Sequence, residues 1–248
     1  MQQYFKMSES CSDVEMELLM NPKAFLFDLD GVLTDTAEYH YLAWKELAEE
    51  LQLKFDRGDN ERLKGVSRIR SFEILLEIND ALNRFSEAEK NDYANRKNLR
   101  YQQLIEQIRP SDLLPGIPEF LAQAKTHGML LAVASASKNA DKVLRLLGIA
   151  QQFDYIADAA LVRNSKPDPE VFLVCAAALG VPPEACIGFE DAQAGIEAIH
   201  GAQMFSVGIH VEVKTQPPML ALASTAELKL QTVLQAFARH RATAASQR

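Results

Sequence analysis

The chain has 248 residues, which is enough for one large or two modest domains with a substantial buried core. A hydrophobic content of 48% beside 24% charged residues is ordinary for a globular protein. The net charge of -8 argues against nucleic acid or an anionic membrane as the main partner, although a local basic pocket for a phosphate fits within an acidic whole.

No segment has the pattern of a membrane span or a secretory signal. The longest unbroken apolar run covers residues 171–179, well short of the roughly 18 residues that suggest a membrane helix. Residues 1–22 contain no long apolar region, and we expect them to form a poorly ordered extension. Cys11, Cys175 and Cys186 lack the spacing of a metal site. We therefore expect a cytoplasmic protein.

Strand-like and helix-like patterns alternate along most of the chain. The expected strands are 24–29, 129–134, 153–156, 186–189 and 204–209. The expected helices between and after them are 117–126, 138–147, 169–179, 192–200 and 227–239. This alternation predicts an α/β fold with a doubly wound parallel sheet and helices on both faces.

One interval after the first strand breaks that alternation. Only amphipathic helical patterns occur there, at 36–51, 67–78 and 86–108. A helical block in this position predicts an inserted second domain, and the two prolines and one glycine of 109–116 suit the linker back to the sheet. The expected division is an extension at 1–22, a catalytic core at 23–35 and 110–248, and a helical cap at 36–109.

Two carboxylates, Asp28 and Asp30, stand at the C-terminal end of the first expected strand. Because a strand has a period of two, both project to the same side. Gly31 then permits a sharp turn. Ligands of open α/β sheets collect at the carboxyl ends of strands. By itself the segment also fits a plain polar exit from a strand into a loop.

Three further polar segments occupy corresponding positions later in the chain. Ser135 ends the second strand and Ser137–Asn139 opens the next helix, where these residues suit either an anion site or a helix cap. Lys166 lies in a loop before a helix, a position that solvated lysines often have. Glu190 and Asp191 follow a strand and precede a helix, where they suit either capping or metal binding.

Taken together, the four segments supply the groups that metal-assisted phosphoryl transfer needs. Carboxylates repel a phosphate unless cations intervene, and Mg²⁺ prefers carboxylate and phosphate oxygens. Lys166 adds a positive point charge that, with Mg²⁺, would keep Asp28 ionised and nucleophilic. Asp30 would then act as the general acid and base for an alcohol that gives or receives a phosphoryl group.

These segments resemble the four motifs of the haloacid-dehalogenase-type phosphotransferase superfamily: FDLDG, Ser135, Lys166 and the pair Glu190-Asp191. The resemblance implies a Rossmann-like core with a helical cap inserted after the first motif. It implies Asp28 as the phosphorylated nucleophile and Asp30 as general acid and base. It further implies one Mg²⁺ per subunit, held by the Asp28 carboxylate, the Asp30 main-chain carbonyl and Asp191, with Glu190 in the same shell.

Within that superfamily the chain is most similar to the β-phosphoglucomutases. The segments that carry this similarity are FDLDGVLTDTAEYHYLAWKELAEE, LKGVSR, RKN, ASASKN and GFEDAQAGI, in the same order. The implied reaction interconverts β-D-glucose 1-phosphate and D-glucose 6-phosphate, with β-D-glucose 1,6-bisphosphate as intermediate and activator. Ser135 and Lys166 would hold the transferring phosphoryl group. The distal phosphate would be held by Arg68, Ser137, Lys138 and Asn139.

The cap is expected to provide the sugar contacts. Thr36, His40 and Trp44 have the spacing i, i+4, i+8 and form one stripe on the first cap helix, although such a stripe also suits a partly buried amphipathic helix. By resemblance, His40 couples cap closure to Asp30. The remaining substrate contacts implied by the resemblance are Gly65, Val66, Ser67, Lys97 and Ala136.

Several functions remain open from the sequence. A sugar-phosphate phosphatase would share every core motif, and a mutase for a related sugar phosphate would share the cap as well. A sensor that binds a sugar phosphate without turnover is disfavoured because it needs neither Asp28 nor Asp30. In every case the expected partner is a small sugar phosphate, with no nucleic acid and no membrane, and the expected state is a monomer.

Overall fold

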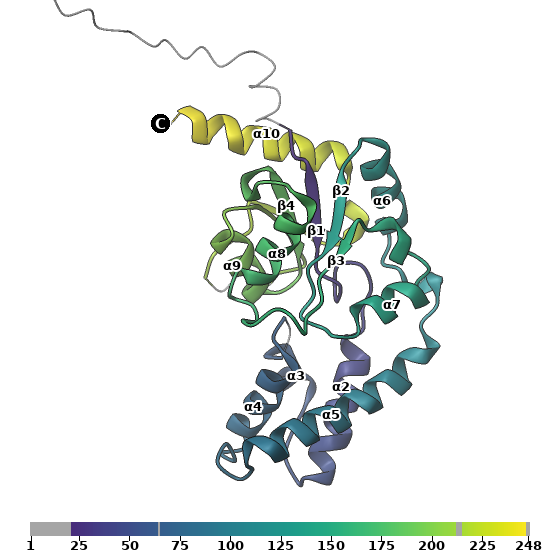
Figure 1. Ribbon diagram of the computed structural model, residues 1–248, viewed down its shortest axis with the longest axis vertical. Coiled ribbons are helices and arrows are strands. Elements are labelled where there is room, and N and C mark those ends of the chain that lie inside the picture. Colours follow the sequence, from purple (N-terminus) through teal and green to yellow (C-terminus); the bar gives the residue numbers. More distant parts are fainter. Residues whose placement is uncertain (1–20, 64, 212–214, 247–248) are drawn as a thin grey trace, which may run out of the picture.

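The computed structural model describes residues 21–63, 65–211 and 215–246, so nearly all of the expected extension at 1–22 lies outside the described residues. Within this part a six-stranded parallel sheet has the order β3-β2-β1-β4-β5-β6 (Figure 1). The strands are β1 Ala24–Phe27, β2 Leu130–Val133, β3 Tyr155–Ile156, β4 Cys186–Glu190, β5 Phe205–Ile209 and β6 Leu220–Leu222. The α/β fold with a parallel sheet is therefore confirmed.

Helices cover both faces of the sheet because successive side chains of a strand point to opposite sides. In β1, Phe25 and Phe27 pack on one face with α6, α7 and α10, whereas Ala24 and Leu26 pack on the other with α8 and α9. The helices are α6 Ile117–Thr126, α7 Ala140–Leu146, α8 Glu170–Leu179, α9 Gln193–Gly201 and α10 Leu230–Ser246. A strand buried on both faces reads as continuously apolar, as β1 does.

The inserted segment is entirely helical among its described residues and has its own small core. It consists of α2 Ala37–Glu50, α3 Arg57–Glu61, α4 Arg68–Ile78, α5 Glu87–Leu104 and the short 3₁₀ turn Ile105–Gln107. Trp44 and Leu47 of α2 pack there against Phe72 and Leu75 of α4. In Figure 1 this cap, drawn in blue, lies beyond the edge of the sheet where β1 ends. The boundaries at residues 36 and 109 stay a prediction.

The two connections between cap and core run side by side. Thr34 bridges to Leu113, and the Thr34 hydroxyl donates to the carbonyl of Asp112 at 2.8 Å. The amide of Leu114 donates to the carbonyl of Leu33 at 3.0 Å. The cap therefore leaves and returns to the core at one place, directly after the Asp28–Asp30 turn.

Some short elements differ from the sequence expectations. The edge strand β6 was not expected, because three residues are too few to display an alternating pattern. The expected helix at 227–239 begins later, at Leu230, because Glu227 ends a 3₁₀ turn and its carboxylate accepts the amide of Ala223. None of the helices in the described ranges combines the length and apolarity needed to cross a bilayer.

A cluster of aromatic side chains packs between α6 and one face of the sheet. Phe120 of α6 is 1% exposed, and its ring centroid lies 5.6 Å from that of Phe25 and 5.5 Å from that of Phe189. Phe120→Ala should lower the free energy of unfolding by about 3–5 kcal/mol, the usual cost of emptying an aromatic core position. Urea denaturation measures this. The control Leu161→Ala, at a side chain 76% exposed, should stay within about 0.5 kcal/mol of the parent. Equal losses in the two variants would contradict the described packing.

Candidate active site

The carboxyl edge of the sheet brings the first and last sequence motifs together. β1 and β4 are parallel neighbours with Phe27 opposite Phe189, so Asp28 and Glu190 are the next residues on adjacent chains. The amide of Asp28 also donates to the carbonyl of Phe189 at 3.0 Å, which continues the pairing by one step. Both side chains are buried. Register between two strands therefore determines where the carboxylates meet.

Three of the predicted metal ligands form a compact cluster. Carboxylate oxygens of Asp28, Glu190 and Asp191 all lie within 4.8 Å of one another. Two glycines make the approach possible: a Cβ at Gly31 would lie 2.1 Å from Asp191 Oδ2, and one at Gly195 would lie 1.9 Å from Glu190 Oε1. Gly31 also has a φ of 74°, which favours glycine. An all-oxygen donor set of this kind fits Mg²⁺.

Lys166 lies buried between two of these carboxylates. Its Nζ donates to Asp28 Oδ1 at 2.5 Å and forms a second, short hydrogen bond with Glu190 Oε1. Burial alone would lower the pKa of Lys166, but the adjacent Asp28 and Glu190 carboxylates outweigh it and raise that pKa. Burial raises the pKa of Glu190, and the lysine opposes that effect. Lys166 is therefore a fixed cation that reduces the repulsion within the carboxylate cluster.

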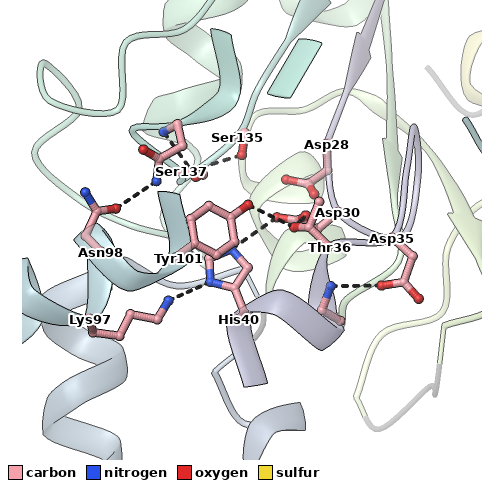
Figure 2. A network of polar contacts seen from close by, with 12 residues as sticks. Asp28, Asp30, Asp35, Thr36, His40, Lys97, Asn98, Tyr101, Ser135 and Ser137 are labelled. Carbon is pink, nitrogen blue, oxygen red and sulfur yellow. Dashed lines mark hydrogen bonds and ion pairs between the residues drawn. The ribbon is translucent and has the colours of Figure 1, made fainter. Parts of the chain in front are cut away.

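Asp30 belongs to a polar network that includes the cap (Figure 2). Thr36 donates a short hydrogen bond to Asp30 Oδ1, and the Tyr101 hydroxyl donates to Thr36 Oγ1 at 3.1 Å. His40 Nε2 lies 4.0 Å from Asp30 Oδ2. Desolvation raises the pKa of Asp30 to about 7, and repulsion from Asp28 adds to that rise. A carboxyl group with this pKa can both give and take a proton near neutrality.

His40 and Lys97 form the cap side of the network. Lys97 Nζ lies 2.7 Å from His40 Nδ1, and the His40 and Tyr101 rings stack with centroids 4.0 Å apart. Burial lowers the pKa of Lys97 to about 7, with repulsion from Arg68 adding to it. Burial also holds the pKa of His40 well below its ordinary value. A neutral His40 can accept from Lys97 at Nδ1 and direct an N–H at Nε2 toward Asp30.

Four of the six predicted phosphate residues follow the neighbouring strand β2, with one difference from expectation: they are Ser135, Ser137, Lys138 and Asn139. Ser135 is buried at the end of β2, and the amide of Ser137 donates to its hydroxyl at 3.2 Å. Helix α7 begins at Ala140 rather than 138, so Asn139 stands at the N-cap position. Ser137 is thus not the helix cap; its hydroxyl accepts from the amide of Asn139 at 3.2 Å within the loop. Lys138 between them is exposed.

The cap loop before α4 reaches the core. A Cβ on Gly65 would lie 3.8 Å from both Lys166 Cδ and Ala192 Cβ, so Gly65 lies against Lys166. Ser67 is the N-cap of α4 and accepts from the amide of Arg70 at 3.3 Å. The half-buried residues of the expected substrate set are His40, Gly65, Val66, Ser67 and Ala136. Arg68, expected to bind phosphate, is half-buried as well.

Trp44 differs from its expected place on a sugar-facing stripe. The side chain is 2% exposed, and its ring lies parallel to that of Phe72 within the cap core. Its link to the network is Lys97 Nζ, 4.7 Å from the ring centroid. His40 and Trp44 lie one turn apart on α2, whereas Thr36 is the N-cap residue before it, and the turn containing Trp44 faces the other cap helices.

Sequence reasoning missed Tyr101, which joins Thr36 to the cap helix α5, and assigned no role to Asn98. A signal was available: Tyr101 lies four residues after Lys97 and therefore on the same face of α5. Asn98 Oδ1 accepts from Asn139 Nδ2 at 2.8 Å, so α5 contacts the loop Ser137–Asn139 as well as the Asp30 network.

Comparison with known proteins agrees with this geometry. The chain is 45% identical over 219 residues to "Beta-phosphoglucomutase" of Bacillus subtilis, covering 88% of this chain and 97% of that protein. It is 32% identical to "Hexitol phosphatase B" of Escherichia coli O157:H7, covering 81% of this chain and 89% of that one. A crystal structure of β-phosphoglucomutase from Clostridium difficile superposes with a TM-score of 0.84 at 44% identity, covering 88% and 98% of the two chains. The profile of the haloacid dehalogenase-like hydrolases matches residues 22–203. The chain belongs to the haloacid dehalogenase-like hydrolase family.

Proposed function

We propose that this protein is a phosphomutase that interconverts β-D-glucose 1-phosphate and D-glucose 6-phosphate through β-D-glucose 1,6-bisphosphate and a phosphoaspartyl enzyme. The 45% identity to a β-phosphoglucomutase supports the reaction. The observation that carries it is a second cationic group on the cap. Arg68 lies close enough to Lys97 to lower its pKa, while Lys166 is held separately by Asp28. Two cationic places, one contributed by the cap and one by the core, suit a substrate with two phosphates.

Asp28 is the nucleophile in this proposal. Its carboxylate is buried at the strand end, and one oxygen already accepts from Lys166. Lys166 and Ser135 would contact the phosphoryl oxygens during transfer, while an Asp28 oxygen forms and later breaks the bond to phosphorus. Mg²⁺ held by Asp28, Glu190 and Asp191, together with the Asp30 main-chain carbonyl, would supply positive charge against the phosphoryl oxygens.

Asp30 would move the proton in each half-reaction. When phosphorylated Asp28 gives its phosphoryl group to the 6-hydroxyl of β-glucose 1-phosphate, Asp30 takes the hydroxyl proton. After the bisphosphate has reversed its orientation in the site, Asp28 takes the phosphoryl group from the 1-position, and Asp30 returns the proton to the sugar oxygen. A pKa of about 7 suits both directions.

Cap and core together would hold the phosphate that is not transferring. Arg68, Ser137, Lys138 and Asn139 are proposed for this role, with Lys97 and His40 toward the sugar. Gly65 lies against Lys166, which supports a cap that covers the reacting groups and limits the access of water. A phosphatase needs only one phosphate site, so a holding site favours the mutase.

The wider proposal is a monomeric enzyme in the cytoplasm. Cys175 and Cys186 are buried free thiols, which suits a reducing compartment. Burial raises the pKa of both thiols to about 12, so neither is a reactive thiolate.

The reaction itself is tested by a coupled assay with Mg²⁺ and catalytic bisphosphate. The wild-type protein should convert β-glucose 1-phosphate to glucose 6-phosphate without matching release of free phosphate, and should leave the α anomer unconverted. Asp28→Asn should abolish turnover, because an amide cannot accept the phosphoryl group, while keeping the wild-type circular dichroism spectrum. Free phosphate released at the rate of sugar-phosphate consumption would favour the sugar-phosphate phosphatase, the alternative that the hexitol phosphatase relative supports.

The metal site is tested by thermal unfolding without sugar phosphate. Because Mg²⁺ would bind the folded carboxylate cluster and not the unfolded chain, added Mg²⁺ should raise the melting temperature of the wild type. In Asp191→Asn most of that Mg²⁺-dependent rise should disappear. Glu119→Gln, at an exposed carboxylate on α6, is the matched control and should keep it. An undiminished rise in Asp191→Asn would remove Asp191 from the site.

A further inference from the structure

Helix α5 presents two adjacent stripes of side chains to two different parts of the site. Lys97 and Tyr101 are four residues apart and contact the Asp30 network through His40 and Thr36. Asn98 and Gln102 follow each of them by one residue and therefore form the neighbouring stripe. Figure 2 shows Asn98 beside the Ser135–Ser137 loop, while Lys97 faces His40.

The second stripe holds the side chain of Asn139 at both ends of its carboxamide. Asn139 Nδ2 donates to Asn98 Oδ1 at 2.8 Å, and Gln102 Nε2 donates to Asn139 Oδ1 at 2.8 Å. Asn139 is 6% exposed and belongs to the core, whereas Asn98 and Gln102 belong to the cap helix. Two complementary hydrogen bonds fix both the place and the orientation of one amide plane.

These contacts continue into the core through the loop itself. The amide of Asn139 donates to Ser137 Oγ, and the amide of Ser137 donates to Ser135 Oγ, each at 3.2 Å. Farther along α7, Lys142 Nζ donates to the carbonyl of Gln102 at 3.3 Å and pairs with Glu106 at 2.5 Å. The C-terminal half of α5 is therefore attached to the start of α7 by several polar contacts.

We propose that Asn98 and Gln102 are positioning residues for the loop Ser137–Asn139, which would hold the distal phosphate. They orient the Asn139 carboxamide and fix the position of this loop relative to α5, the helix that carries Lys97 and Tyr101. This proposal rests on the mutase function above, in which Asn139 contacts the distal phosphate. The side-chain amide of Asn139 has two N–H groups, and one of them donates to Asn98 Oδ1. The second stays available for a phosphate oxygen, at an angle that the two cap residues determine.

A consequence is that one helix, α5, sets the position of the held phosphate relative to Asp30, the proposed general acid and base. Lys97 and Tyr101 reach the Asp30 network from the same two turns of α5 that hold Asn139. A rotation of α5 about its axis would shift both contacts together. The distance between the held phosphate and Asp30 is then set by neighbouring residues of one rigid element.

The test compares Gln102→Met with Gln103→Met. Methionine has a similar length and no N–H donor, and Gln103 is an exposed neighbour on the same helix. Amide hydrogen exchange of residues 135–140 should accelerate in Gln102→Met only. Calorimetric titration of the Mg²⁺-loaded protein with glucose 6-phosphate should give a dissociation constant roughly 3- to 10-fold higher in Gln102→Met, the scale of a lost hydrogen bond. At saturating substrate, kcat should change much less than KM.

A double-mutant cycle separates positioning from a general structural effect. In an Asn139→Ala background, Gln102→Met should raise the dissociation constant no further, because Gln102 would act through Asn139. Equal affinities in Gln102→Met and Gln103→Met, or full additivity with Asn139→Ala, would overturn the proposal. If the mutase assay failed but these differences in binding were observed, the proposed reaction would be wrong and the positioning role would still hold.

Discussion

The site depends on a buried lysine that offsets the repulsion between carboxylates at the end of two parallel strands. Register between β1 and β4 brings Asp28 beside Glu190, and both carboxylates are buried. Without a cation between them, one would take up a proton, because two buried like charges at this separation are strongly unfavourable. Lys166 contacts both. It thereby joins the two buried carboxylates through one cation.

Asp28 and Asp30 lie two residues apart, but β1 ends at Phe27, before both of them, and their environments differ. Asp28 faces Lys166 and the acidic cluster, whereas Asp30 faces Thr36 and the cap. Desolvation without a close cation raises the pKa of Asp30 to about 7. These different surroundings suit the roles proposed above, in which Asp28 is the nucleophile and Asp30 carries the proton. Because the cap supplies part of those surroundings, its position bears directly on proton transfer.

Much of the core site could be predicted from the sequence because strand ends are marked locally. Asp28, Ser135 and Glu190 each follow an apolar run, and parallel strands bring such ends to one edge of the sheet. Lys166 is different, since a loop lysine carries no pattern of its own. Its burial depends on two partners that are 138 and 24 residues away in the chain.

The cap was harder to predict, and the reason is physical. An amphipathic helix has one apolar face, but a helix that packs on two neighbours uses more than one, and periodicity does not say which face meets which neighbour. Trp44 lies in the cap core although it shares a stripe of α2 with His40, and the periodicity alone did not indicate this. Tyr101 and Gln102 lie in a strongly polar helix, where their partners Thr36 and Asn139 are remote in sequence.

The central claim is that Asp28 carries the phosphoryl group between the two ends of the sugar. The most direct measurement is rapid acid quenching of the Mg²⁺-loaded protein with radiolabelled bisphosphate, followed by peptide mass spectrometry. If Asp28 is the carrier, the peptide containing it should bear one labelled phosphoryl group, and this label should pass to sugar bisphosphate when β-glucose 1-phosphate is added. Label on another residue, or a label that passes only to water, would contradict it.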